Sequence, residues 1–409
     1  MIGPRNKVSE YLSQITSLKC VFFLTFAMVS ASLGWIACVA VALPFLLLSS
    51  VLPMFYIHSK YRFITRFIAA TFLRIITFFI ITIYGTTLTT SGDNLSNVDV
   101  TTGKVQPVII LCNQRTRVDT LFMLGLFEKA NLLPYLKIQL HSKLRAVPVV
   151  GWIFQYFQYM FVDVGDSTKW EIDRTSMLET MECLQDHTPC YLIYCEAEHI
   201  TPTSLLLANE YSSSKGLTPR KYVLHPKVNT SELLINQLRE THPETLMVYD
   251  LTLAYEDYND NRPTSEVSFA NGFMPNNVHI NVEKIMVSNI PSEENDTDKT
   301  NNEKSKFEKW INNRWERKEK DLKLYYESDE KIIHPFKNNL HVVFSSRCIP
   351  SMKIVLSILL TGVASYLYFS RFKFFVWTIF IGLQLLINIC FDGVHQLEKR
   401  IRVSKKKTR

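Results

Sequence analysis

The stretch Ile109-Ile-Leu-Cys-Asn-Gln-Arg-Thr-Arg-Val-Asp119 links a segment that predicts a strand to a segment that predicts a helix. The apolar run at 108–111 indicates a buried strand, and the apolar spacing over 120–129 is typical of an amphipathic helix. The polar residues 113–119 therefore lie on a turn between the two. Because loops on a rigid scaffold often carry catalytic side chains, this turn is the first candidate for a functional site.

The composition indicates a membrane protein with a water-facing middle. The chain has 409 residues, room for one large domain or two ordinary ones, and its apolar residues are concentrated at both ends. The net charge of +7 is too diffuse to indicate nucleic acid as a partner, and it suits contact with anionic lipid head groups. The 8 cysteines include no CxxC pair and no zinc-ligand spacing, so we expect free thiols in a reducing compartment.

The N-terminal apolar run at 20–57 contains no Asp, Glu, Lys or Arg. As a helix it would be about 57 Å long, at about 1.5 Å per residue, whereas the hydrocarbon core of a bilayer is about 30 Å thick. The run is therefore either a hairpin of two spans that turns near 30–34, or one span and an interfacial piece kinked at Pro44 and Pro53. The following segment, 67–84, predicts a helix in the membrane surface, with a third span as the alternative.

The C-terminal region predicts a transmembrane helical hairpin, with minimal spans at 354–370 and 374–391. The chain then ends on Lys406-Lys-Thr-Arg409, which resembles the dilysine signal that retrieves membrane proteins to the endoplasmic reticulum. The alternative is a basic tail that obeys the positive-inside rule. Both interpretations place the C-terminus and the middle domain of a multi-pass protein in the cytosol, and the dilysine resemblance predicts the endoplasmic reticulum membrane.

The middle of the chain alternates short apolar runs with helical patterns, which predicts a layered α/β domain. Strands are expected at 108–111, 191–195 and 246–255, helices at 120–129 and 169–184, and a polar loop at 90–106. The predicted organisation is a cytosolic leader at 1–19, membrane segments at 20–89, the α/β domain at 90–290, a disordered linker at 291–306, a charged helix (307–326) with the end of the domain at 307–350, the transmembrane hairpin at 351–391 and a basic cytosolic tail at 392–409.

Four segments of this middle region resemble the motifs of one enzyme family. Residues 113–119 look like the NHxxxxD box of glycerolipid acyltransferases. Lys143-Leu-Arg-Ala-Val-Pro-Val-Val-Gly-Trp152 resembles the second box, Leu192-Ile-Tyr-Cys-Glu196 falls where the FPEGT box should be, and Val223-Leu-His-Pro-Lys227 resembles the VLxPR element. The chain is identified as a divergent member of the 1-acylglycerol-3-phosphate acyltransferase superfamily, similar to its lysophosphatidylinositol and lysocardiolipin acyltransferase branch.

The resemblance implies an O-acyltransferase (EC 2.3.1.-) that moves a fatty acyl group from acyl-CoA to a hydroxyl of a lysophospholipid. Its fold would be a membrane-anchored α/β domain, its partners would be lysophospholipid, acyl-CoA and the bilayer, and no metal or bound cofactor is implied. The candidate substrate-binding residues are Asn113, Lys143, Glu196 and Lys227. Trp310 and Trp315, in a later segment that also follows the family pattern, are expected to be packing residues.

The first box departs from the family at its central position. The family has a histidine that takes the proton of the attacking hydroxyl, held by a carboxylate five residues later. This chain keeps the carboxylate as Asp119 but has Gln114 in place of the histidine, and a carboxamide accepts no proton near pH 7. Gln114 could instead hydrogen-bond Asp119 and hold the turn. The third box also departs, with Ala197 and Glu198 in place of Gly and Thr.

Two hypotheses follow from these departures. The chain is either an acyltransferase with impaired or altered catalysis, or a pseudoenzyme that keeps the fold to bind lipid or a partner in the membrane. The candidate catalytic positions are Gln114 and Asp119. Both hypotheses remain open at the level of the sequence.

Overall fold

The computed structural model describes most of the chain. The described residues are 18–51, 55–78, 80–81, 84–98, 105–163, 167–184, 187–196, 198–214, 216–242, 246–256, 268, 274–291, 305–327, 341–344, 353, 356, 357, 359, 363 and 374–407. They form two compact units, one made of residues 1–24, 79–130 and 190–348 and the other of 25–78, 131–189 and 349–409.

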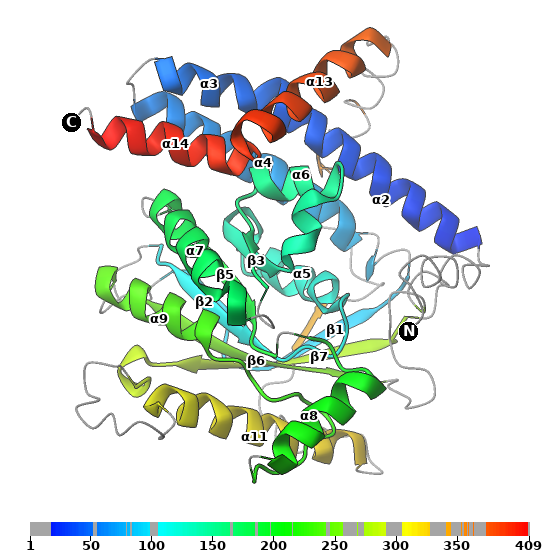
Figure 1. Cartoon of the computed structure of the whole chain (residues 1–409). Helices are drawn as coiled ribbons and strands as arrows, with labels where there is room; N and C mark the ends of the chain where they lie inside the picture. The colour runs from blue at the N-terminus through cyan, green and yellow to red at the C-terminus, as the bar shows by residue number, and fades with distance from the viewer. Residues whose placement is uncertain are drawn as a thin grey trace. The chain divides into compact units, whose positions relative to one another are not determined.

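The first unit is built on a mixed sheet in the order β5-β2-β6-β7-β1-β8 (Figure 1). Its strands are β1 (Thr87–Gly92), β2 (Val108–Cys112), β5 (Cys190–Tyr194), β6 (Met247–Tyr255), β7 (Asn277–Ile285) and β8 (His341–Phe344). β2 runs parallel to both β5 and β6, whereas β7 is antiparallel to β6. Every residue of β2, β5 and β6 is buried, which agrees with the mainly apolar sequences of these strands.

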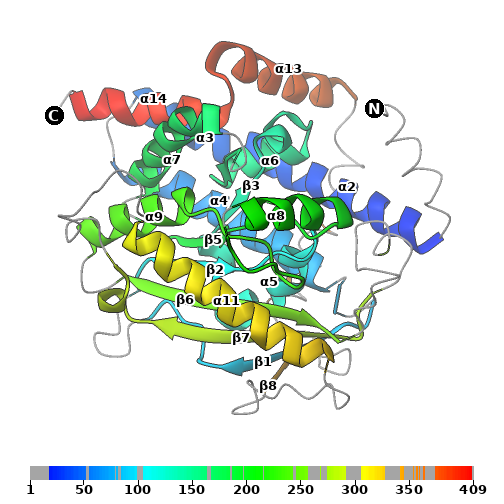
Figure 2. The ribbon, with the colours of Figure 1, turned by 60° about the horizontal axis from the view of Figure 1, so that its bottom comes forward.

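Four long helices pack around this sheet within the first unit. They are α5 (Asp119–Lys129), α8 (Pro202–Ser214), α9 (Asn229–Thr241) and α11 (Lys306–Glu327). Figure 2 shows α11 lying along β6 and β7. Its buried residues Ile311, Trp315 and Leu322 recur at helical spacing, so one face of an otherwise charged helix is apolar. This explains why a helix with so many charges is held against the sheet.

The second unit is mainly helical. Its elements are α2 (Leu18–Ala37, from Thr25 onward), a π-helical turn (Cys38–Ala42), α3 (Leu43–Val51), α4 (Phe55–Phe78), a 3-10 turn (Leu133–Tyr135), β3 (Leu136–Leu140), another 3-10 turn (Ser142–Ala146), α6 (Val150–Tyr156), β4 (Met160–Phe161), a third short turn (Ser167–Lys169), α7 (Trp170–Leu184), α13 (Phe374–Phe391) and α14 (Val394–Lys407). β3 pairs in parallel with β4. The side chains of α14 reach α7, for example through Lys399 and Glu179 at 2.9 Å.

Several predicted elements are confirmed to within about one residue. They are the strands expected at 108–111, 191–195 and 246–255 and the helices expected at 120–129, 169–184 and 307–326. The mixed α/β class predicted for the middle region is also confirmed. The loop expected at 90–106 is wrong at its start, because β1 extends to Gly92 beside β7.

The predicted surface helix at 67–84 has the wrong bounds, because α4 begins at Phe55 and ends at Phe78. Arg62 follows the uncharged run at 20–57 and precedes the predicted helix at 67–84. In the structure it lies inside α4 and is only 2% exposed. It is ion-paired with Glu398 of α14, so a tertiary contact accommodates a charge that the local pattern places outside the helix. Local hydropathy carries no signal of such a distant partner.

The N-terminal apolar run contains no turn at 30–34, because α2 continues through these residues to Ala37. The stretch Met28–Ser49 is apolar and long enough to cross a membrane. In the described part of the chain, Ile379–Phe391 and Val394–Arg402 pass the same criterion only together, as one segment bent by 58°. The other predicted C-terminal span, at 354–370, and the linker at 291–306 lie largely outside the described residues.

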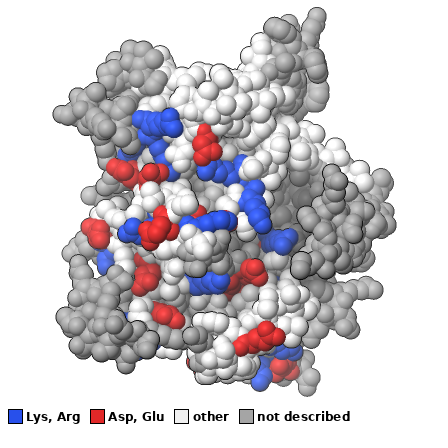
Figure 3. All heavy atoms as spheres, viewed as in Figure 1, with Lys and Arg blue, Asp and Glu red and all other residues white. Residues whose placement is uncertain are grey.

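Charges of both signs are interspersed on the face shown in Figure 3. This distribution agrees with the diffuse net charge of +7 noted from the sequence. It differs from the single-sign stripe that is typical of nucleic-acid-binding surfaces.

Candidate active site

Asn113 fixes the start of the turn between β2 and α5. Its Oδ1 accepts a hydrogen bond from the backbone N–H of Leu253 at 2.8 Å, and its Nδ2 donates to the Leu253 carbonyl at 3.3 Å. Because Leu253 belongs to the neighbouring strand β6, this side chain continues the ladder after the backbone of β2 turns away. The side chain is fully buried, so its geometry supports a positioning role for Asn113.

Asp119, the first residue of α5, is fully buried, and its carboxylate accepts hydrogen bonds from four donors. The hydroxyls of Tyr255 and Thr116 each donate to Oδ1 at 2.5 Å. The backbone N–H of Arg115 donates to Oδ2 at 2.7 Å, and that of Thr116 lies 3.1 Å from both oxygens. The carboxylate therefore holds the backbone of the turn in the residues that follow position 114.

Burial raises the pKa of Asp119 to about 6, and the hydrogen bonds from Thr116, Tyr255 and Arg115 oppose that rise. At neutral pH the carboxylate is still mostly ionised, stabilised by hydroxyl and amide dipoles. Since the side chain of Asp119 is 0% exposed, a substrate outside the turn does not contact its carboxylate directly.

Gln114 is partly exposed, unlike its neighbours Asn113 and Arg115. Its backbone N–H donates to the carboxylate of Glu196, which links the first box to the third. Within the described part of the chain, the Gln114 carboxamide makes no hydrogen bond to Asp119, so the predicted bond between these two side chains is wrong. The donors described above already surround both oxygens of Asp119.

Glu196 connects three segments that are distant in the sequence. Its Oε1 accepts from the Trp315 indole at 2.8 Å, and its Oε2 accepts from the backbone N–H of Leu224 at 3.1 Å. Burial raises the pKa of Glu196 to about 8, with these bonds, Lys318 and Gln114 opposing the rise. The carboxyl group is therefore largely protonated at neutral pH, and it acts as a buried junction between the boxes.

Trp315 was predicted to be a packing residue, and its complete burial agrees with that role. The sequence pattern missed that its indole also reaches Glu196 of the third box. A neighbouring buried pair holds the same helix, because Lys318 lies 2.6 Å from Asp250 of β6 and donates to the Leu251 carbonyl at 2.7 Å. Lys318 lies three residues after Trp315, a spacing that places both on one side of α11.

Substitution Trp315→Phe is expected to lower the free energy of unfolding by about 1–3 kcal/mol, because it keeps the ring but leaves Oε1 of Glu196 buried without its donor. Thermal unfolding of the purified chain measures this effect. Trp310→Phe on the same helix is the control, since the Trp310 ring contacts Phe307 and Arg314 instead. Equal stabilities of the two variants would contradict the role assigned to the indole.

The other candidate site residues belong to both units and differ in exposure. Lys227 is exposed, and its backbone N–H bonds the Cys195 carbonyl at 2.6 Å. Lys143 is also exposed, but it belongs to the second unit. Arg115 is 3% exposed, with its guanidinium 4.5 Å from the centre of the Tyr326 ring. Ala197 lies outside the described residues.

Tyr255 and Thr116 are the site residues to which sequence reasoning gave no role. Tyr255 is the last residue of β6, and its hydroxyl reaches Asp119 from the strand next to β2. β6 continues four residues beyond Leu251, the partner of the last residue of β2, so Tyr255 reaches the turn that follows β2. In the described residues, no group of three or more His, Cys, Asp or Glu side chains is arranged to hold a metal ion.

Comparisons with known proteins found the following similarities. Residues 89–217 match the family model described as Acyltransferase. Lysocardiolipin acyltransferase 1 of Gallus gallus is 27% identical over 380 residues, which cover 88% of this chain and 94% of that protein. Lysophosphatidylinositol acyltransferase 10 of Caenorhabditis elegans is 27% identical over 235 residues, which cover 56% of each chain. The crystal structure of the 1-acyl-sn-glycerophosphate (LPA) acyltransferase from Thermotoga maritima aligns at 15% identity with a TM-score of 0.38, covering 74% of this chain and 97% of that chain.

Residues 89–217 thus resemble an acyltransferase domain, and the similarity supports the O-acyltransferases as the class of enzyme. The curated relatives are lysophospholipid acyltransferases, and the similarity is consistent with the branch of lysocardiolipin and lysophosphatidylinositol acyltransferases. The resemblance stated from the four boxes is confirmed.

Proposed function

We propose that this chain transfers a fatty acyl group from acyl-CoA to a hydroxyl of a lysophospholipid, with turnover reduced by Gln114. The observation that carries the proposal is the first box, in which Asp119 keeps four hydrogen-bond donors while Gln114 offers no base. The relatives at 27% identity, named for lysophospholipid acyl transfer, support this substrate class.

The chemistry defines what the turn has to do. The lipid hydroxyl oxygen attacks the thioester carbonyl, a new C–O bond forms, the C–S bond breaks, and the hydroxyl proton finally leaves with the thiol. The Gln114 carboxamide oxygen can accept a hydrogen bond from the hydroxyl and orient it, but it cannot remove the proton. Because a general base contributes about 10²–10⁴ in rate, orientation alone leaves a slow enzyme.

Asp119 acts on this reaction as a positioning residue. Its oxygens bond the backbone N–H groups of Arg115 and Thr116, the two residues that follow Gln114. We assign a substrate contact to the exposed Lys227 of the first unit, which would bind phosphate of the head group or of CoA, and we keep the exposed Lys143 of the second unit as a separate candidate for such a contact. Asn113 and Glu196 complete the proposed site as the buried supports of the turn.

The proposed cellular setting is the endoplasmic reticulum membrane. The apolar stretch Met28–Ser49 would anchor the chain, with a C-terminal hairpin and a cytosolic basic tail that ends on the dilysine-like residues 406–409. The acyltransferase domain would face the cytosol, where acyl-CoA is available. We keep the domain limits 1–19, 20–89, 90–290, 291–306, 307–350, 351–391 and 392–409 as part of this proposal.

The second candidate function is a pseudoenzyme that binds lipid or a membrane partner. It is favoured by the absence of a proton-accepting side chain at position 114 and by the full hydrogen bonding of the buried Asp119. A binding protein needs the fold of the boxes but not their base.

An acyl-transfer assay separates the two candidates. Membranes carrying the full chain are supplied with labelled acyl-CoA and a panel of lysophospholipids, and Asp119→Asn is compared with wild type. Glu316→Gln, an exposed position of α11, is the matched control for loss of one carboxylate. Wild-type turnover above empty membranes that falls roughly tenfold in Asp119→Asn alone would support the enzyme. Background turnover on every acceptor, with lipid binding retained, would reject the enzyme in favour of the binding protein.

A further inference from the structure

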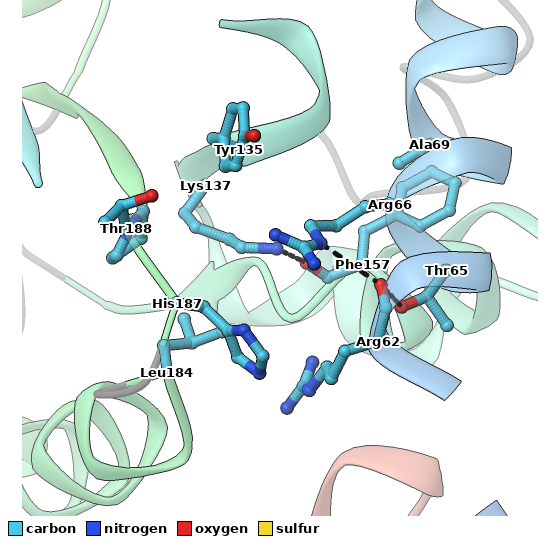
Figure 4. A pocket seen from close by; sticks show the side chains of 11 residues that line it. Arg62, Thr65, Arg66, Ala69, Tyr135, Lys137, Phe157, Leu184, His187 and Thr188 are labelled. Carbon is cyan, nitrogen blue, oxygen red and sulfur yellow. Dashed lines mark hydrogen bonds between the residues drawn. The ribbon is translucent and has the colours of Figure 1, made fainter. Parts of the chain in front are cut away.

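A buried cluster of basic side chains lines a narrow pocket in the second unit, away from the four sequence boxes (Figure 4). Arg62 and Arg66 come from α4, Lys137 comes from β3, and His187 follows α7. The remaining lining residues are Thr65, Ala69, Tyr135, Phe157, Leu184, Thr188 and Pro189. Basic side chains from three separate segments thus meet around one space.

Two of these basic groups are removed from water, whereas Arg66 and His187 are partly exposed. Arg62 is 2% exposed and Lys137 is 6% exposed. The Lys137 amine donates to the Phe157 carbonyl at 2.6 Å, and the Arg66 Nε donates to the Arg62 carbonyl at 3.3 Å (Figure 4). Each of these bonds satisfies one donor with a neutral oxygen, so the positive charges of Lys137 and Arg66 are not neutralised by them.

Only one carboxylate of the described residues balances this cluster. Glu398 pairs with Arg62, and it also accepts from Tyr61 at 3.3 Å and from Gln158 at 2.7 Å. The described residues that line the pocket include no Asp or Glu. An excess of positive charge therefore remains at Arg66 and Lys137.

Burial and the neighbouring positive charges lower the pKa values of Lys137 and His187. Burial together with Arg62 and Arg66 lowers the pKa of Lys137 to about 7, with Glu398 opposing the fall. Burial and the same cations lower the pKa of His187 to about 2, so that this ring is neutral. Lys137 thus loses much of its charge unless an anion enters the pocket.

We propose that the pocket formed by Arg62, Arg66, Lys137 and His187 is a binding site for a phosphate group. An arginine fork and an ammonium group suit the oxygens of a phosphate, and buried charge-assisted bonds of this kind are strong. The neutral His187 ring can donate one further N–H. The group has two sources, the head group of an anionic glycerophospholipid or soluble phosphate. Basic pockets among helices of membrane proteins are known to receive lipid head groups.

The test uses the full chain in two settings. In nanodiscs of phosphatidylcholine, with or without phosphatidic acid, native mass spectrometry measures how much phosphatidic acid stays bound. In detergent, the rise in apparent Tm with inorganic phosphate, at matched ionic strength against chloride, reports soluble phosphate. The variants are Lys137→Met and the half-exposed Arg66→Gln, and the control is Lys60→Gln, which removes an exposed charge from the same helix.

We expect retention of phosphatidic acid, or the response to inorganic phosphate, to fall roughly tenfold or more in both pocket variants and to persist in Lys60→Gln. A selective loss in nanodiscs identifies the lipid as the source, and a selective loss in detergent identifies soluble phosphate. Equal binding by wild type, Lys137→Met and Lys60→Gln, or no binding in either setting, overturns the site. The proposal does not depend on acyl transfer, because binding is measured without acyl-CoA.

Discussion

Substitution Gln114→His is expected to raise acyl transfer by roughly 10²–10⁴-fold, the usual contribution of a general base. The negative charge that would stabilise an imidazolium is already close to position 114, although the oxygens of Asp119 also accept bonds from Arg115, Thr116 and Tyr255. Asp119 sits at the start of α5, ionised at neutral pH and five residues beyond position 114, and the backbone between them is held by its own hydrogen bonds. Position 114 is partly exposed, so the new imidazole can meet a substrate hydroxyl.

The gain has two controls that isolate the imidazole. Gln114→Asn keeps a carboxamide and should leave turnover near that of wild type. In the double variant Gln114→His/Asp119→Asn, most of the gain should disappear, because the imidazolium loses its carboxylate. Turnover of Gln114→His should also fall at acidic pH as the imidazole is protonated, a titration that a carboxamide does not show. A folded Gln114→His variant without increased turnover would show that the site lacks more than a base.

The turn itself could be predicted because its signals are local. The apolar run of β2, the polar residues 113–119 and the spacing of α5 lie within about twenty residues, and the structure places their boundaries within one residue of expectation. The bonding of the site could not be predicted in the same way. Tyr255 and Trp315 reach Asp119 and Glu196 from strands and helices far away in the sequence. Trp315 fits the apolar face of α11, and the sequence of that helix does not indicate that its indole N–H donates to Glu196 of the third box.

The pocket of the second unit illustrates the same limit. The basic residues of α4 indicate a membrane-surface helix when α4 is considered alone, and the sequence assigned no role to Lys137. Only the packing of α4 beside the 3-10 turn at Leu133–Tyr135 brings Arg66 over the Tyr135 ring at 5.6 Å and Lys137 to the same space. Because the basic residues of this pocket come from separate segments, no periodic pattern in the sequence indicates that they lie together.

Lys137→Met is expected to stabilise the phosphate-free protein at neutral pH and to flatten its dependence on pH. The folded pKa of Lys137 is lowered to about 7 from 10.5. Between these values the unfolded chain holds a proton that the folded chain has released, so stability rises with pH by about 1.4 kcal/mol for each pH unit. Below about pH 7 both states are protonated and the full destabilisation is present. Loss of the bond to the Phe157 carbonyl costs about 1 kcal/mol, which is less than the charge penalty removed.

Apparent Tm values of the full chain in detergent between pH 6.5 and 10 check this expectation, with Lys60→Gln as the control that should keep the wild-type slope. The groups that act on Lys137 are Arg62, Arg66 and Glu398. Parallel slopes in wild type and Lys137→Met would contradict the assignment. Phosphate should flatten the slope of wild type as well, because a bound anion restores the charge of Lys137. A pocket that is unfavourable when empty and neutralised when filled would thus couple the stability of this unit to the phosphate it binds.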